Sequence, residues 1–132
     1  MSVEDFENIR WKEKNQSVVF RHEAALSMIG EGTVLDVGCG DGLMMDMLVK
    51  NVSSGVDISE EGIKKCLKKN LDVYLCDFSR EKLPFSEDSF DYVVILDVLE
   101  HLYSPEFLLQ EAHRVSKKNI IISVPNFNSL PA

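Results

Sequence analysis

Cysteine and histidine are scarce in this chain, and neither is spaced for metal binding. There are three of each in 132 residues, no two cysteines form a C-x-x-C pair, and the histidines are scattered. These six residues are Cys39, Cys66, Cys76, His22, His101 and His113. The spacing excludes the common structural zinc motifs, so we expect no metal site. An odd number of cysteines favours a reducing compartment, and hence a cytoplasmic location.

Basic residues and long apolar runs are also in short supply. The chain has 14 lysines and arginines against 22 aspartates and glutamates, which gives a formal net charge of −8. This balance argues against a nucleic-acid or anionic-membrane surface, because phosphate binding depends on Lys and Arg. No apolar stretch reaches membrane-spanning length, and the polar, acidic N-terminus does not match a signal peptide. A small-molecule ligand remains compatible with this composition.

Glycines are few, but three of the seven stand together in the most informative segment of the chain. Residues 34–42, VLDVGCGDG, indicate a short buried strand, a glycine-rich turn and the start of a helix. Such a turn lets a ligand approach bare backbone, and the helix N-terminus behind it offers N–H groups to an anion. Asp57 follows about 20 residues later, where nucleotide-binding α/β folds hold ribose hydroxyls. The two segments predict a ligand with an anionic end and an adenosine-like end.

The details of the turn narrow the choice among nucleotide ligands. A dinucleotide fingerprint needs a third small residue where Leu43 stands, and a P-loop needs a Lys followed by Ser or Thr, which is absent. Asp36 and Asp41 flank the turn and suit a cationic group better than a pyrophosphate. S-adenosylmethionine (SAM), which carries a carboxylate, an ammonium, a sulfonium, a ribose and an adenine, fits these features. A tight strand–helix turn without a ligand is the alternative.

Apolar periodicity predicts alternating strands and helices. Expected strands cover residues 33–37, 52–57, 73–76, 90–96 and 119–124, and expected helices cover residues 42–51, 59–70 (with Ser59 as N-cap) and 105–116. This alternation indicates βαβ units and a parallel sheet. The whole chain, 1–132, is expected to form a single domain, made of an N-terminal helical segment, residues 1–30, and a βαβ core, residues 33–126.

Residues 33–126 resemble the class I SAM-dependent methyltransferases. The resemblance rests on the ordered motifs VLDVGCGDG, GVDIS, YLCDF, LPFSEDSFDYVVILDVLEHL and NIIISVPN. Within that superfamily, GVDISEEGIKKCLKKNLDVYLCD and SVPNF look most like the MetW group, which is linked to methionine biosynthesis. The resemblance implies a three-layer α/β Rossmann-like core with strand order 3-2-1-4-5. It also implies two further strands that this sequence lacks, so the domain is expected to be C-terminally short.

The same resemblance implies cofactor contacts along the carboxyl edge of the expected sheet. The turn would lie beneath the methionine part, an acid after the second strand would hold the ribose, and the following positions would border the adenine and the rest of the cofactor. The residues concerned are Asp36, Gly38, Cys39, Gly40, Asp57, Ile58, Asp77, Phe78, Leu96 and Asp97. Plainer interpretations stay open: Asp57 could cap the helix beginning near Ser59, and Asp77 could be a solvated loop acid.

Two functions of different classes follow from the resemblance. The first is in-line transfer of a methyl group from SAM to a small-molecule acceptor, with S-adenosylhomocysteine (SAH) as product and His101 as a candidate general base. The second is a non-catalytic, cofactor-binding accessory protein of methionine biosynthesis, because the MetW group is associated with a homoserine acyltransferase. An NAD-dependent oxidoreductase is disfavoured by Leu43 and by the absence of a Tyr-x-x-x-Lys pair.

The last expected strand, residues 119–124, would present an apolar edge of the sheet. Natural proteins cover such edges, because unpaired backbone groups there invite pairing with other chains. Either the natural domain continues beyond this sequence or a partner, such as a second copy in a homodimer, is expected to cover the edge.

Overall fold

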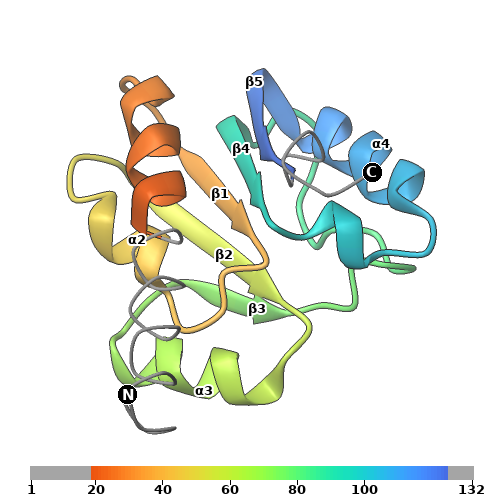
Figure 1. Ribbon diagram of the computed structural model, residues 1–132, viewed down its shortest axis with the longest axis horizontal. Coiled ribbons are helices and arrows are strands. Elements are labelled where there is room, and N and C mark those ends of the chain that lie inside the picture. The colour runs from red at the N-terminus through yellow and green to blue at the C-terminus, as the bar shows by residue number, and fades with distance from the viewer. Residues whose placement is uncertain (1–18, 125–132) are drawn as a thin grey trace, which may run out of the picture.

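The computed structural model describes residues 19–124, and Figure 1 shows a sheet with helices packed around it. Residues 19–28 are helical and lead towards the first strand. The strands are β1 (Val34–Val37), β2 (Ser53–Asp57), β3 (Val73–Leu75), β4 (Phe90–Leu96) and β5 (Ser116–Ser123). The helices that join them are α2 (Leu43–Met47), α3 (Glu60–Lys68), the short 3-10 helix η1 (Leu99–His101) and α4 (Pro105–Val115).

Within the described residues the strands form a parallel sheet of order β3-β2-β1-β4-β5. Val34, at the start of β1, pairs with Ser53 of β2 on one side and with Tyr92 of β4 on the other. Because the strands all run the same way, their carboxyl ends meet at one edge, which is where open α/β sheets bind ligands. The α/β class and the strand order predicted from the sequence are both confirmed.

Buried residues of β1 and β4 alternate between the two faces of the sheet. Leu35 and Ile95 lie in the apolar cluster on the face that α4 covers. Val34 and Val94 lie in a second cluster, on the face covered by residues 19–28 and α2. Strands buried on both faces need nearly continuous apolar sequence, which VLDV and VVIL supply. The result is a three-layer arrangement, with α4 and the first described helix on opposite sides of the sheet in Figure 1.

Most expected boundaries lie close to the observed ones, but the first helix after β1 is shorter than predicted. It was expected to reach residue 51, and α2 ends at Met47. The chain turns here, and the Asn51 side chain donates hydrogen bonds to the carbonyl oxygens of Gly30 and Gly32 at 3.0 and 2.8 Å. These contacts join two connections that are about 20 residues apart in sequence. The local pattern of apolar residues therefore does not predict them.

Two further boundaries depend on local chemistry. The predicted N-cap is confirmed, because the Ser59 hydroxyl accepts a hydrogen bond from the N–H of Gly62 at 3.2 Å. β5 begins at Ser116 instead of residue 119, since it follows α4 directly and pairs with Phe90 across an irregularity in the register. Of the helical segment expected at residues 1–30, residues 19–28 are helical, and the part before residue 19 lies outside the described residues.

β5 forms one edge of the sheet and, among the described residues, pairs with β4 alone. Ile122 and Val124 are 41% and 59% exposed near its end. The apolar character expected of this edge is therefore present. Its pairing with a second copy concerns another chain and stays a prediction.

A partly buried ion pair connects the loop between β3 and β4 to α4. Glu111 is 6% exposed, and its Oε1 accepts a hydrogen bond from the N–H of Leu83 at 2.8 Å. Arg114 donates to both carboxylate oxygens of Glu111 and to the carbonyl oxygens of Leu83 and Phe85. The hydrogen bond from Arg114 is the main cause that keeps the pKa of Glu111 below its ordinary value. The pair thereby satisfies backbone groups of the loop that leads into the central strand β4.

We expect Glu111→Ala to lower the free energy of unfolding by about 1–3 kcal/mol, because it leaves the Arg114 guanidinium and the N–H of Leu83 without their shared acceptor. Glu61→Ala is the matched control, since Glu61 is exposed and its carboxylate lies 3.9 Å from the Lys64 ammonium in a surface pair. Urea unfolding of both variants and the parent chain at neutral pH measures the two losses. Equal losses would contradict the role assigned to Glu111.

Candidate functional site

The turn after β1 takes a backbone shape that favours glycine. Gly38 has a φ of 79° and Gly40 a φ of 55°, both in the left-handed region. A Cβ at position 38 would also lie 2.5 Å from Cγ2 of Val98, so the turn packs directly against the segment after β4. The G-x-G pattern therefore reflects both backbone conformation and close packing.

Gly40 leaves open space where a side chain would stand. Within the part of the chain that the structure describes, no heavy atom lies within 4 Å of its Cβ position. On the other side of the turn, a Cβ at Gly62 of α3 would lie 2.7 Å from the carbonyl oxygen of Gly40. The helix α3 thus supports the turn from one side, while the other side lets a ligand reach bare backbone.

The Asp57 carboxylate ties the first strand–helix turn to the second. Its Oδ2 accepts a hydrogen bond from the N–H of Gly40 at 2.8 Å, and its Oδ1 accepts one from the N–H of Ser59 at 2.8 Å. The capping interpretation of Asp57 is therefore seen in the contact with Ser59. Each carboxylate oxygen keeps a second lone pair, so capping leaves Asp57 able to accept further hydrogen bonds.

Asp36 is a buried carboxylate on β1. It is 4% exposed, and no hydrogen bond found within residues 19–124 reaches its side chain. Burial, and secondarily the charge of Asp57, raises the pKa of Asp36 from 3.8 to about 7. An incoming cation would stabilise the ionised form of this group, because none of the described side chains balances its charge.

A pocket of about 320 Å³ opens at the carboxyl edge of the sheet. Its lining comes from the ends of β1, β2 and β4, from the start of the β3–β4 loop and from the segment around η1. The lining residues are Gly38, Asp57, Ile58, Phe78, Leu96, Asp97, Val98, His101 and Leu102. Seven of these were singled out from the sequence, so the fold gathers most of the predicted site in one place.

Four predicted residues do not line this pocket: Asp36, Cys39, Gly40 and Asp77. The first three belong to β1 or to the turn that follows it. Asp77 is engaged within its own loop, where Ser79 donates to its Oδ1 and Arg80 lies 2.9 Å from its Oδ2. The hydrogen bond from Ser79 is the main cause that lowers the pKa of Asp77.

Cys39 and Cys66 are buried free thiols beside the turn. The Cys66 thiol donates to the carbonyl oxygen of Gly40 at 3.2 Å, and burial raises the pKa of both cysteines. A raised pKa leaves little of the nucleophilic thiolate, and both thiols lie buried beside the turn. Among residues 19–124, no three His, Cys, Asp or Glu side chains gather as a metal site, and no helix has the length and apolar character to span a membrane.

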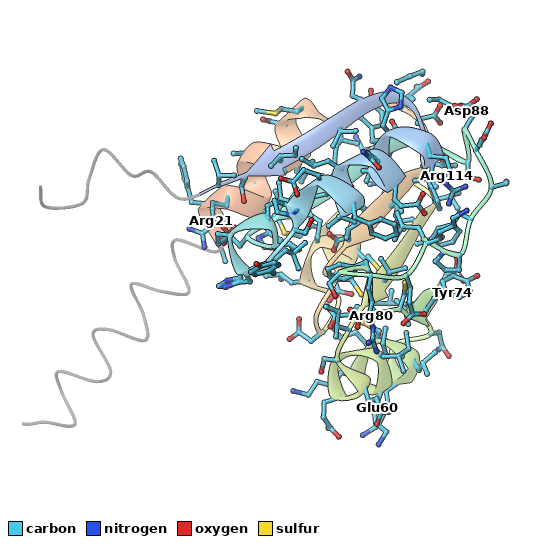
Figure 2. All side chains as sticks on the ribbon, turned by 90° about the vertical axis from the view of Figure 1, so that its right-hand side faces the viewer. Arg21, Glu60, Tyr74, Arg80, Asp88 and Arg114 are labelled. Atoms are coloured by element: carbon cyan, nitrogen blue, oxygen red, sulfur yellow. The ribbon has the colours of Figure 1, made fainter. Side chains whose placement is uncertain are left out.

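Asp97, at the end of β4, is held by two other elements. It adopts a φ of 57°, which is uncommon for a residue other than glycine. The Arg21 guanidinium Nε lies 2.7 Å from its Oδ2, and the Ser123 hydroxyl donates to its Oδ1 at 3.2 Å. Figure 2 shows Arg21 at the opposite end of the molecule from Asp88 and Arg114. Sequence reasoning missed Arg21, because 76 positions separate it from Asp97 and no motif connects them.

His101 lies at the rim of the pocket with its side chain 76% exposed, and its Nε2 is 3.7 Å from Oε1 of Glu100. Sequence reasoning also missed Val98 and Leu102 as lining residues. Both follow Leu96 within the motif VLEHL, but apolar residues there are typical of core packing. The signal that could have found them is their place just beyond the carboxyl end of a central strand.

This sheet, with a glycine turn after β1 and an acid at the end of β2, has the Rossmann-like fold of class I SAM-dependent methyltransferases. A solved Thermotoga maritima SAM-dependent methyltransferase, described as a possible histamine N-methyltransferase, aligns with a TM-score of 0.73 and 25% identity. The alignment covers 88% of this chain and 56% of that one. The family model described as methionine biosynthesis protein MetW matches residues 20–130, and the chain belongs to the MetW family.

Two curated relatives show the breadth of this similarity. The bifunctional methionine biosynthesis protein MetXA/MetW of Rhodopirellula baltica is 30% identical over 117 residues, which cover 80% of this chain and 19% of the relative. A ubiquinone biosynthesis O-methyltransferase of Pelagibacter ubique is 27% identical over 126 residues, covering 91% of this chain and 52% of the relative. The chain therefore spans about half of one relative and about a fifth of the other.

Asp36 should make stability depend on pH. Its folded pKa is about 7, above the ordinary 3.8, so between these values the folded chain holds a proton that the unfolded chain has lost. Stability should therefore fall as pH rises through this window, by a few kcal/mol at most, and Asp36→Asn should abolish that fall. Urea unfolding at about pH 5 and about pH 8 measures the difference, with Asp88→Asn as the same substitution at an exposed position. Parallel pH profiles for the parent chain and Asp36→Asn would contradict the expectation.

Proposed function

We propose that this chain binds SAM as one domain and transfers its methyl group to a small-molecule acceptor. The observation that carries the proposal is the pocket at the carboxyl edge, where Gly38 and Asp57 meet beside the uncompensated carboxylate of Asp36. The acids at this edge would repel the phosphates of a phosphate-bearing cofactor. SAM instead brings an ammonium and a sulfonium, together with ribose hydroxyls that donate hydrogen bonds.

The residues present fit SAM. The open side of Gly40 leaves room for a ligand against the backbone, and Asp36 is a buried acid that lacks a cation among the described residues. In this proposal Gly38, Cys39 and Gly40 lie beneath the methionine part, and Asp36 faces the ammonium. Asp57 accepts from the ribose hydroxyls with its remaining lone pairs.

The other predicted contacts complete the proposed site. Ile58, which is 46% exposed, and the buried Phe78 supply apolar surface for the adenine. Asp77 accepts from the adenine amino group, which requires its loop contacts with Ser79 to adjust. Leu96 and Asp97 border the cofactor at the end of β4.

SAM supplies a methyl group on a good, neutral leaving group. The chain's task is then to align donor and acceptor and to exclude water from the line between them. A general base is needed only where the acceptor loses a proton as it attacks. His101 lines the pocket, and histidine is the side chain that most often serves as a general base, so it is the proposed base for such an acceptor.

A second candidate function is that of a non-catalytic SAM-binding accessory protein in methionine biosynthesis. It is favoured by the MetW family match and by the relative in which MetW is joined to MetXA in one bifunctional protein. In this case an acyltransferase partner is proposed. A cytoplasmic location and a homodimer through the β5 edge are proposed for either function. Release of SAH in the presence of candidate acceptors distinguishes the two functions, because an accessory protein would bind SAM without turnover.

Calorimetric titration with SAM and SAH, with NAD as the control ligand, tests the proposed function. We expect binding of SAM and SAH in the micromolar range and none of NAD. Binding of NAD alone, or of none of the three, would overturn the proposed site.

Asp57→Ala should weaken SAM binding by about 1–3 kcal/mol, because it removes the acceptor for the ribose hydroxyls and for the Gly40 N–H that joins the two turns. Ser59→Ala is the matched control, since it removes the N-cap of α3 and leaves the Asp57 carboxylate in place. Calorimetry on both variants measures the two affinities. An equal loss in Ser59→Ala would assign the effect to the helix cap instead of the ribose contact.

A further inference from the structure

Two elements contact the carboxylate of Asp97, the residue that follows β4. The helix of residues 19–28 supplies Arg21, whose Nε lies 2.7 Å from Oδ2. The end of β5 supplies Ser123, whose hydroxyl donates to Oδ1 at 3.2 Å and accepts from the N–H of Asp97 at 3.0 Å. The Arg21 and Asp97 side chains are 34% and 31% exposed, so the ion pair is partly shielded from solvent. The contacts of Arg21 and Ser123 hold Asp97, which lines the pocket, in the left-handed backbone region.

The strand order determines where Asp97 lies relative to Asp57. β1 lies between β2, which ends at Asp57, and β4, which Asp97 follows, so the two acids stand on opposite sides of the glycine turn. The place of SAM relative to Asp97 rests on the proposed function. A SAM molecule whose ribose lies at Asp57 crosses β1 and presents its other end, with the sulfonium, towards β4 and Asp97.

We propose that Arg21 is a positioning residue that sets the preference of this site between SAM and SAH. The two ligands differ at sulfur, where SAM carries a positive charge and SAH does not. Arg21 offsets the negative charge of Asp97 beside that position and so limits how strongly the site favours the cationic ligand. Ser123 holds the same carboxylate without contributing charge, and therefore affects both ligands alike.

The first step of the test compares Arg21→Gln with a variant that makes the same charge change elsewhere. Lys118→Gln is suitable, because Lys118 pairs with Asp91 at 3.9 Å near the amino ends of β4 and β5, away from the pocket. SAM and SAH affinities are measured by calorimetry at low salt. Arg21→Gln should raise the ratio of SAM to SAH affinity by about threefold or more, and Lys118→Gln should leave it unchanged.

Three more variants separate charge from structure. Arg21→Lys retains the charge and should keep the parent ratio, while Asp97→Asn should lower it. Ser123→Ala should weaken SAM and SAH binding together and leave the ratio as it is. Circular dichroism of each variant checks folding, and Asp97→Asn supplies the reciprocal measurement if Arg21→Gln does not fold.

The outcomes distinguish this inference from the proposed function. Absence of SAM and SAH binding in the parent chain would overturn both. Binding of both ligands by the parent, with ratios in Arg21→Gln and Asp97→Asn equal to that of Lys118→Gln, would overturn the role of Arg21 alone. A ratio of SAM to SAH affinity that rises in Arg21→Gln and falls in Asp97→Asn supports the inference.

Discussion

The hydrogen bond from the Gly40 N–H to the Asp57 carboxylate joins the two turns on which the pocket depends. The turn after β1 is first anchored to β2, because the N–H groups of Gly38 and Cys39 both donate to the carbonyl oxygen of Val56. The left-handed conformations at Gly38 and Gly40 then direct the chain towards Asp57. Parallel pairing of β1 and β2 brings these groups to the same edge, so the site follows from the sheet register.

Much of this fold could be predicted because its signals are local. The apolar run of β4 gave its boundaries at Phe90 and Leu96, and the cap at Ser59 marked the start of α3. Where the outcome depends on contacts distant in sequence, the prediction was less accurate. Helix α2 ends early, at Met47, before a turn that Asn51 fixes through hydrogen bonds to a preceding connection. The periodicity of apolar residues does not predict such contacts.

The candidate site shows the same contrast between local signals and contacts distant in sequence. Residues such as Asp57 and Leu96 could be selected because parallel strands bring their carboxyl ends together, whatever the details of packing. Arg21 could not, since its significance comes from one ion pair with Asp97 across the fold. Arg114 is a comparable case, because its contacts with the β3–β4 loop depend on where α4 lies against the sheet.

The three acids at the carboxyl edge differ in how their charge is compensated. Asp57 accepts hydrogen bonds from two backbone N–H groups, and Asp97 is paired with Arg21. Asp36 has neither kind of partner among the described residues, and its pKa of about 7 is the consequence. Among the described residues, no cation balances the charge of Asp36. A ligand that brings positive charge to β1 supplies what the fold leaves out, whereas a pyrophosphate would add to the repulsion, and this asymmetry favours SAM over a dinucleotide.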